Sequence, residues 1–269
     1  VAINQWEQAE DSMYTLCGKD RIHPSTDGHL VMAYLFLKAQ GLAGKPVADI
    51  RIDGAGKKVT RSDNCRVSDL SVSSDNLTFT YEAKSLPYPI DTSYYDNEKH
   101  TQADALSVIP FMDEMNYEGL SVSGLSDGYY GLTIGGEFIG RFTARELERG
   151  INMALLQNTP QYKQAMKIRQ MNEERWLKER KMREFYWVEY NLMRKTGMLW
   201  ACNEAAVDTL RKYRPHDIFL QWNGDLWLQY MHKGIREDCV NEQQDLVNRI
   251  YEQNKPIPLR IEIKKFTDL

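Results

Sequence analysis

The sequence predicts an α+β protein, and three patterns along its 269 residues indicate this fold class. An apolar run of helical length lies near residue 30, period-two alternation recurs between residues 45 and 142, and helix-favouring segments fill most of residues 143–269. These changes of period predict three successive segments, 1–44, 45–142 and 143–269. The length is sufficient for a sizeable core and about two structural units.

The first segment contains one strongly apolar helix, expected over residues 29–40. Asp27 or Thr26 can cap it, Leu30 to Leu37 form its apolar run, and Gly41 ends it. A helix that is apolar on nearly every side is typically buried on most faces. A core aliphatic side chain left in water forgoes about 1.5–3 kcal/mol, so we expect a missing N-terminal half of the protein, or a homo-oligomeric partner, to cover this helix.

The second segment is predicted to form a small antiparallel β-sheet or sandwich, because apolar and polar residues alternate repeatedly. Gly135-Gly136 is a hairpin signal between two of these runs. Residues 86–105 are mostly polar and contain two prolines, so we expect a surface loop there. The alternating runs are 47–53, 77–81, 120–123, 130–134 and 138–142.

The third segment is predicted to be mainly helical with one last strand. Thr143 and Glu146 form a capping box, which predicts a helix to about Leu156. Pro160 at a first helical position then opens a long helix that we expect to reach Gly197. Further helices are expected over 200–213 and 236–254, and a strand over 259–263.

Composition and charge exclude several classes of function. The net charge of −4 provides no field that would recruit nucleic acid. The basic residues of the long helix are interspersed with glutamates, which is typical of a solvated face. No apolar run approaches the ~18 residues of a transmembrane helix, so we expect no membrane span.

The cysteines and histidines give no metal-site spacing. The four cysteines, Cys17, Cys65, Cys202 and Cys239, are widely separated and include no C-x-x-C pair, so we expect free thiols, although sequence cannot choose among the possible pairings. His100, His216 and His232 show no ligand spacing and have no carboxylate at a metal-site offset. We therefore predict no metal and no cofactor.

The segment that carries candidate chemistry is Asp20-Arg21-Ile22-His23-Pro24, followed by Gly28-His29. An aspartate three residues before a histidine can accept a hydrogen bond from one imidazole nitrogen. That bond fixes the tautomer and leaves the other nitrogen free to take a proton from a nucleophile. A chance D-x-x-H on a surface turn is the alternative interpretation.

This block resembles the last conserved block of the SGNH (GDSL-type) esterase/lipase family, in which D-x-x-H-P and G-H precede the final helix. The resemblance covers about residues 1–42. It implies that residues 1–44 are the C-terminal end of a flavodoxin-like α/β/α domain, a remnant of which would be the apolar helix. It implies Asp20 as the orienting acid, His23 as the general base, and supporting roles for Gly28 and His29. Residues 45–269 are also similar to the C-terminal extension of some long members of this family.

The resemblance implies a serine ester hydrolase acting on short acyl esters, such as glycan O-acetyl groups, and a secreted or periplasmic location. The family's nucleophile lies in a Gly-Asp-Ser block upstream of the Asp/His block. Gly224-Asp225-Leu226 lacks the serine, and Ser126-Asp127-Gly128 is interpreted as a turn. We therefore expect the nucleophile to lie outside this sequence, and the isolated chain to be inactive.

The alternative function is a non-catalytic carbohydrate- or protein-binding module with a vestigial Asp/His turn. Trp222 and Trp227 flank Asn223-Gly224, where exposed rings could form a sugar-stacking platform. The competing interpretation is a turn at Asn223-Gly224 with both tryptophans packed inward.

Overall fold

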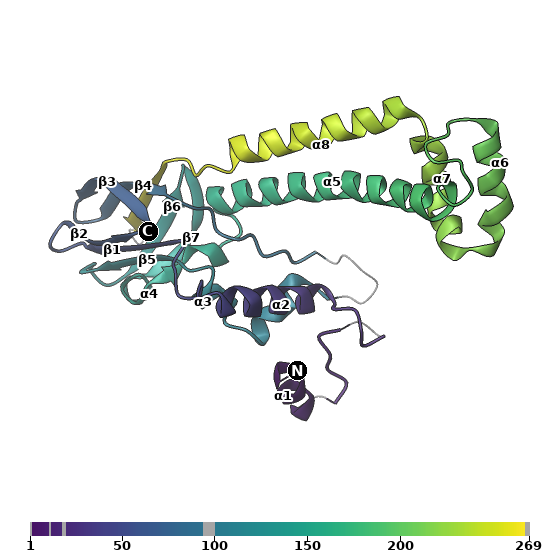
Figure 1. Cartoon of the computed structure of the whole chain (residues 1–269). Coiled ribbons are helices and arrows are strands. Elements are labelled where there is room, and N and C mark those ends of the chain that lie inside the picture. Colours follow the sequence, from purple (N-terminus) through teal and green to yellow (C-terminus); the bar gives the residue numbers. More distant parts are fainter. Residues whose placement is uncertain (1, 11, 18–19, 94–99, 267–269) are drawn as a thin grey trace. The chain divides into compact units, whose positions relative to one another are not determined.

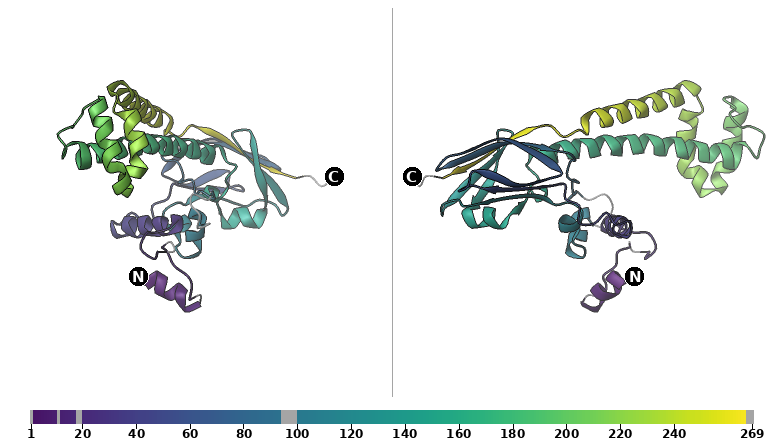
Figure 2. Two further views of the ribbon diagram at one scale, coloured as in Figure 1. Left: turned by 90° about the vertical axis from the view of Figure 1, so that its right-hand side faces the viewer. Right: turned by 60° about the vertical axis from the view of Figure 1, so that its left-hand side comes forward.

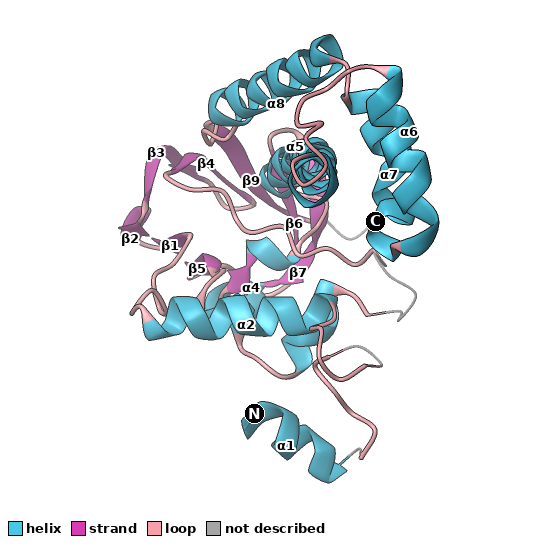
Figure 3. Ribbon diagram, turned by 45° about the vertical axis from the view of Figure 1, so that its right-hand side comes forward, coloured by secondary structure: helices cyan, strands magenta, loops and turns pink. Residues whose placement is uncertain are grey.

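The computed structural model describes residues 2–10, 12–17, 20–93 and 100–266. It divides into two compact units, each traceable by colour in Figure 1. Unit 1 comprises Val1–Met166 and Lys255–Leu269, and unit 2 comprises Lys167–Asn254. The strands belong to unit 1 and unit 2 is helical, as the colouring in Figure 3 shows. The predicted α+β class is confirmed.

The larger sheet of unit 1 has five strands in the order β3-β4-β9-β6-β7, with every neighbouring pair antiparallel. β9 follows unit 2 in the sequence and yet lies between β4 and β6. The strands are β3 (Cys65–Val72), β4 (Asn76–Ala83), β6 (Tyr129–Ile134), β7 (Glu137–Thr143) and β9 (Leu259–Lys265).

The smaller sheet has four strands in the order β2-β1-β5-β8. β1 and β5 pair in parallel, so the expectation of a wholly antiparallel region is wrong here. The long connection between them provides the crossover that parallel neighbours require. The strands are β1 (Ala48–Asp53), β2 (Lys58–Asp63), β5 (Glu118–Ser123) and β8 (Ile151–Asn152).

The two sheets form a sandwich around a shared apolar core, and Figure 2 shows them as layers. Alternation places Leu77, Phe79 and Tyr81 of β4 on the inner face, where all three are fully buried. Glu118 of β5 is also fully buried, and it accepts hydrogen bonds from Tyr81 Oη at 2.8 Å and Gln161 Nε2 at 3.3 Å. Burial raises the pKa of Glu118 to about 7.

α2 (Thr26–Ala39) is the apolar helix expected from the sequence, and Ser25 is its N-cap residue. Its inner face packs onto a layer that includes η1 (Gln102–Ser107) and α3 (Phe111–Glu114). Its opposite face leaves Met32, Leu35 and Phe36 exposed. Burial on most faces was therefore a wrong expectation for this chain, because a layer covers one side of the helix.

Unit 2 is built from helices around Phe185, Val188 and Trp227. A π-helical turn, Glu189–Met193, follows α5, and the buried Glu189 in it accepts hydrogen bonds from Trp227 Nε1 and the backbone N–H of Trp200, both at 2.8 Å. The helices are α5 (Pro160–Val188), which begins in unit 1, α6 (Glu204–Tyr213), η4 (Arg214–His216), α7 (Ile218–Tyr230) and α8 (Lys233–Gln253).

Several element boundaries differ from the sequence expectations. α4 (Ala144–Arg149) begins at the predicted Thr143/Glu146 capping box. It ends before Gly150, whose φ of +96° turns the chain into β8 and η2 (Met153–Leu155), so it does not reach Leu156. Residues 1–44 and 45–142 share one compact unit, and the last strand rejoins it, in place of three consecutive segments. Part of the expected 86–105 loop, residues 94–99, lies outside the described residues.

The four cysteines are free thiols, as predicted. Within the described ranges, no helix combines the length and the apolar character needed to cross a membrane.

Candidate active site

Asp20 organises the tight turn that carries His23. Its Oδ1 accepts hydrogen bonds from the backbone N–H groups of Ile22 at 2.9 Å and His23 at 3.1 Å. Its Oδ2 lies 2.6 Å from Nδ1 of the His23 ring. Arg21 adopts a left-handed φ of +57°, which is uncommon outside glycine. One carboxylate therefore fixes both the backbone of the turn and the orientation of the imidazole.

This pair is open to solvent, with the side chains of His23 and Asp20 exposed by 84% and 49%. The hydrogen bond from the His23 ring, with those from the backbone, lowers the pKa of Asp20 to about 2, so Asp20 is ionised at neutral pH. Because the contact uses Nδ1, it favours the tautomer in which Nε2 can accept a proton. The geometry suits a general base steadied by an acid.

Tight packing fixes the turn against the preceding segment. The backbone N–H of Ser25 donates to the Leu16 carbonyl at 3.2 Å, and Cys17 and Pro24 form an isolated β-bridge. A Cβ placed on Gly28 would lie 2.0 Å from the Leu16 carbonyl oxygen. Only glycine permits this close approach of α2 to the Leu16 carbonyl, and the supporting catalytic role of Gly28 stays a prediction.

Asp27 forms a second polar cluster directly after the turn. It is buried, its Oδ1 accepts hydrogen bonds from Ser25 Oγ and, at 2.8 Å, from the Gly28 N–H, and its Oδ2 lies 3.4 Å from Nδ1 of His100. Burial, and then the nearby Asp27 carboxylate, raises the pKa of Tyr14 to about 12. Sequence reasoning missed this cluster, because His100 comes from a distant loop.

His29 lies in the first turn of α2. Its side chain is exposed, and its backbone N–H donates to the Ser25 carbonyl at 2.9 Å. No side-chain hydrogen bond of His29 is found among the described residues. The structure therefore gives the supporting contacts to Gly28 and Asp27, and a role for the His29 imidazole stays a prediction.

No serine of the described residues contacts the His23 ring. Ser25 is buried and its hydroxyl donates to Asp27, so it cannot act as a nucleophile for His23 in this arrangement. Ser126 lies in hydrogen-bond contact with Tyr130 and Lys265. Asp225, in the sequence that echoes Gly-Asp-Ser, is on α7 and pairs with Arg214.

A cavity of about 390 Å³ adjoins the turn. Residues on both sides of the turn line it, including Leu16, Cys17, Arg21, Gly28 and Met32. The cavity gives the turn an open flank large enough for a small molecule.

The two tryptophans singled out from the sequence both lie in α7, which Asp217 caps, so the expected turn at Asn223-Gly224 is wrong. Trp227 is fully buried in unit 2. Trp222 is 67% exposed and contacts Phe219 edge-on, with ring centroids 5.4 Å apart. The pair therefore offers no common ligand-stacking face, because one ring is inaccessible.

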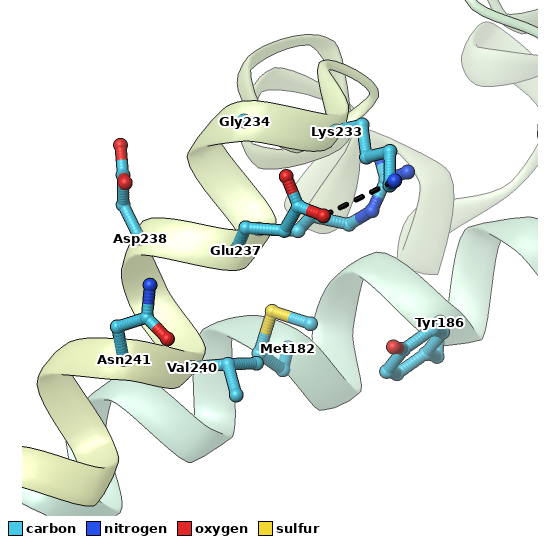
Figure 4. Close-up of a pocket in the computed structure, with 9 residues that line it drawn as sticks. Met182, Tyr186, Lys233, Gly234, Glu237, Asp238, Val240 and Asn241 are labelled. Atoms are coloured by element: carbon cyan, nitrogen blue, oxygen red, sulfur yellow. Dashed lines mark ion pairs between the residues drawn. The ribbon is translucent and has the colours of Figure 1, made fainter.

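Unit 2 also has a cavity of about 550 Å³ between α5 and α8, drawn in Figure 4. Met182 and Tyr186 line it from α5, and Lys233 and Glu237 form an ion pair of 3.1 Å on α8. Its lining holds no histidine. Across the described ranges, no group of three His, Cys, Asp or Glu side chains is arranged to hold a metal ion.

Comparison with known proteins gives two matches. A family model described as the diltiazem deacetylase C-terminal helical domain matches residues 166–255. A solved structure of a gut microbial diltiazem-metabolizing enzyme is 42% identical and aligns with a TM-score of 0.93, covering 99% of this chain and 60% of that chain. No curated protein sequence matches. The chain thus spans about 60% of the length of an enzyme that it resembles from one end of this sequence to the other.

Proposed function

We propose that this chain is part of a serine ester hydrolase of the SGNH type, with His23 as general base and Asp20 as its orienting acid. The observation that carries the proposal is the 2.6 Å contact between Asp20 Oδ2 and His23 Nδ1 on an exposed turn. The resemblance to a diltiazem-metabolizing enzyme, and the match to a deacetylase domain, support hydrolysis of an acyl ester.

The proposed reaction proceeds through an acyl-enzyme. His23 Nε2 takes the proton of a serine hydroxyl as its oxygen attacks the ester carbonyl, and the imidazolium returns that proton to the departing alcohol. His23 then deprotonates a water, which attacks the acyl carbonyl, and the imidazolium returns that proton to the serine oxygen as the acid leaves. Asp20 stabilises the imidazolium in both halves and needs no proton of its own, because its pKa is low.

The nucleophile and the oxyanion hole are proposed to come from a segment N-terminal to residue 1. The exposed face of α2, with Met32, Leu35 and Phe36, supports this assignment, since it offers apolar surface beside the turn. Covering each such side chain is worth about 1.5–3 kcal/mol. In this proposal residues 1–44 complete the catalytic domain, and the same segment that supplies the serine packs on α2.

The proposed substrates are small esters with a short acyl group, and acetyl is favoured by the name of the matching family. The cavity beside Arg21 and Met32 is compatible with a small molecule. Glycan O-acetyl esters and a secreted or periplasmic site of action remain part of the proposal from the SGNH resemblance. The proposed mechanism uses no cofactor.

The test compares ester hydrolysis by the full-length protein with that of His23→Ala. We expect kcat/KM for p-nitrophenyl acetate to fall at least ~10³-fold, because the serine loses its base. His216→Ala, which removes an exposed histidine of unit 2, is the matched control and should hydrolyse at the wild-type rate. Wild-type activity in His23→Ala would refute the mechanism.

A non-catalytic binding module is the second candidate, and the exposed Trp222–Phe219 pair favours it. The exposed indole ring of Trp222, supported edge-on by Phe219, can stack on a sugar ring. A glycan-binding screen of the chain distinguishes the two functions: binding lost in Trp222→Ala, without labelling of the full-length protein by a fluorophosphonate, would favour the module.

A further inference from the structure

We propose that Asp27 is a positioning residue, which holds the His23 turn in place by joining it through Ser25 and His100 to the 100–112 segment of unit 1. The consequence for catalysis rests on the proposed function, whereas the structural link does not. The β-rich part of the chain would then be a component of the active site and not an independent module.

The first support is the set of contacts around one buried carboxylate. The Asp27 side chain is 4% exposed, and burying a charge is costly unless it is paired and hydrogen-bonded. Ser25 Oγ and the Gly28 N–H satisfy Oδ1 from the turn side. His100 faces Oδ2 at 3.4 Å from the other side. The Asp27 carboxylate therefore links the turn before α2 to the segment that begins at His100.

The second support is that α2 has polar contacts at both of its ends with the segment from His100 to Glu114. At its C-terminal end, Tyr34 Oη donates to Glu114 at 2.7 Å and Lys38 Nζ lies 2.7 Å from the same carboxylate. At its N-terminal end, Asp27 faces His100. A helix held at both ends cannot slide or rotate on its support without breaking one of these contacts.

The third support is the apolar packing between the two links. Leu30, Val31 and Tyr34 of α2 are buried in one apolar cluster with Ile109 and five other residues: Ile90, Ala105, Phe111, Met112 and Ala154. Interiors packed in this way transmit small displacements, because side chains leave few voids. A shift of residues 100–112 is thus passed to the turn that carries His23, which lies three residues before Thr26.

The arrangement also excludes a competing interpretation of the same residues. Ser25, Asp27 and His100 are the residue types of a catalytic triad. In a triad the histidine lies between the serine and the acid, whereas here the Ser25 hydroxyl donates directly to Asp27. His100 is on the far oxygen of the carboxylate and cannot deprotonate Ser25. The cluster fits a supporting role.

The first test measures kcat and KM of the full-length protein per fluorophosphonate-labelled site. Asp27→Ala should lower kcat about 10- to 100-fold with little change in KM, because a displaced base is poorly aligned. Asp27→Asn keeps an acceptor for Ser25 and Gly28 and should recover most of that loss. Counting labelled sites removes the effect of a smaller folded fraction. An unchanged kcat in Asp27→Ala overturns the inference, even when His23→Ala is inactive.

The second test uses the present chain and does not depend on catalysis. Long-range ¹H–¹⁵N NMR reads the ring nitrogens of His23 and His100, with His216 as the internal control. Asp27→Ala should change the signals of both His100 and His23 and leave His216 unaffected. If the His23 signals do not move, Asp27 does not position the turn and the inference fails. Should Asp27→Ala not fold, His100→Gln removes one contact and is judged by the same His23 signals.

Discussion

The chain has two aspartate–histidine pairs, whose aspartates are seven residues apart in the sequence. The pairs differ in sequence separation, in distance and in exposure. Asp20 and His23 are close in sequence, 2.6 Å apart and exposed by 49% and 84%. Asp27 and His100 are distant in sequence, 3.4 Å apart, with the aspartate only 4% exposed. The first pair leaves an imidazole nitrogen facing solvent, and the second places its carboxylate among donors.

In the proposed function the exposed pair takes part in the chemistry and the buried carboxylate holds the structure, although both pairs use the same residue types. An exposed carboxylate with a low pKa can stabilise a neighbouring cation as it forms, because it is ionised already. The oxygens of the buried Asp27 carboxylate are already in contact with Ser25, Gly28 and His100, and these contacts hold those groups in place. The two tryptophans of α7 also differ in exposure, since Trp222 is exposed and Trp227 is buried. Glu118 is a second buried carboxyl.

The largest expected effect comes from breaking the exposed pair with Asp20→Asn. The amide can still accept from the turn backbone, but it does not stabilise an imidazolium and can favour the wrong tautomer. We expect kcat of the full-length protein to fall about 10³–10⁴-fold, with a melting temperature close to that of the wild type. Steady-state kinetics and a thermal melt test this, and an active Asp20→Asn enzyme would argue against Asp20 as the orienting acid.

Trp227→Ala extends the contrast to unit 2. It removes a fully buried ring and leaves Glu189 without one of its donors, so we expect a loss of about 3–5 kcal/mol in the free energy of unfolding of this unit. Trp222→Ala, on the same helix but exposed, is the control and should change stability by less than about 0.5 kcal/mol. Denaturant unfolding followed by circular dichroism measures both, and equal effects would contradict the assignment of these side chains.

Glu118→Gln sharpens the comparison with a buried carboxyl that has no histidine partner. The pKa of Glu118 is raised to about 7 from its ordinary 4.5, so the folded state keeps a proton that the unfolded state releases. Stability should therefore fall as pH rises from about 4.5 and level off above 7, by roughly 3 kcal/mol at 1.36 kcal/mol per pKa unit. The neutral variant should lack this slope. Amide exchange in β4 and β5 at pH 5 and pH 8 measures it, and parallel slopes in both proteins would exclude Glu118 as the source.

Gly28→Ala affects both pairs at once. The new Cβ would meet the Leu16 carbonyl at 2.0 Å, and the backbone must move. Overpacking of this kind costs about 1–3 kcal/mol, and we expect lower stability of unit 1 together with altered ring signals of His23 and His100. Gly234→Ala, at a helical position with no atom near the added Cβ, is the matched control. Unperturbed His23 signals in Gly28→Ala would show that the close approach is not needed.

Patterns that depend on neighbouring residues predicted much of the fold. The alternation of Leu77, Phe79 and Tyr81 predicted β4, and the Thr143/Glu146 box predicted the start of α4. β2 was missed because it is largely polar and exposed, and β3 because polar residues separate its few apolar ones. The Asn223-Gly224 pair indicated a turn, but Asp217 caps a helix that continues through it. A local turn preference is weak against a capped helix with a buried face.

In the candidate site, too, the local contact could be predicted from the sequence and the long-range contact could not. The spacing of Asp20 and His23 was sufficient to predict their contact, because the carboxylate and the ring are joined by one turn of backbone. The Asp27–His100 contact could not be predicted, because it exists only once α2 has packed on the 100–112 layer. Nor could the sequence reveal that Met32, Leu35 and Phe36 share an uncovered face while Leu30 and Val31 do not.

The place of β9 has a consequence for the order in which the protein can assemble during synthesis. β9 lies between β4 and β6, and Ile261 and Ile263 fill the centre of the sandwich. Until the ribosome has made unit 2 and the residues beyond it, β4 and β6 each have an unpaired edge, which is open to wrong partners. The helical unit can form first from nearby contacts, whereas the sandwich must wait for a strand made after it. A released chain that ends before Leu259 would thus contain every helix of unit 2 and an unfinished sheet.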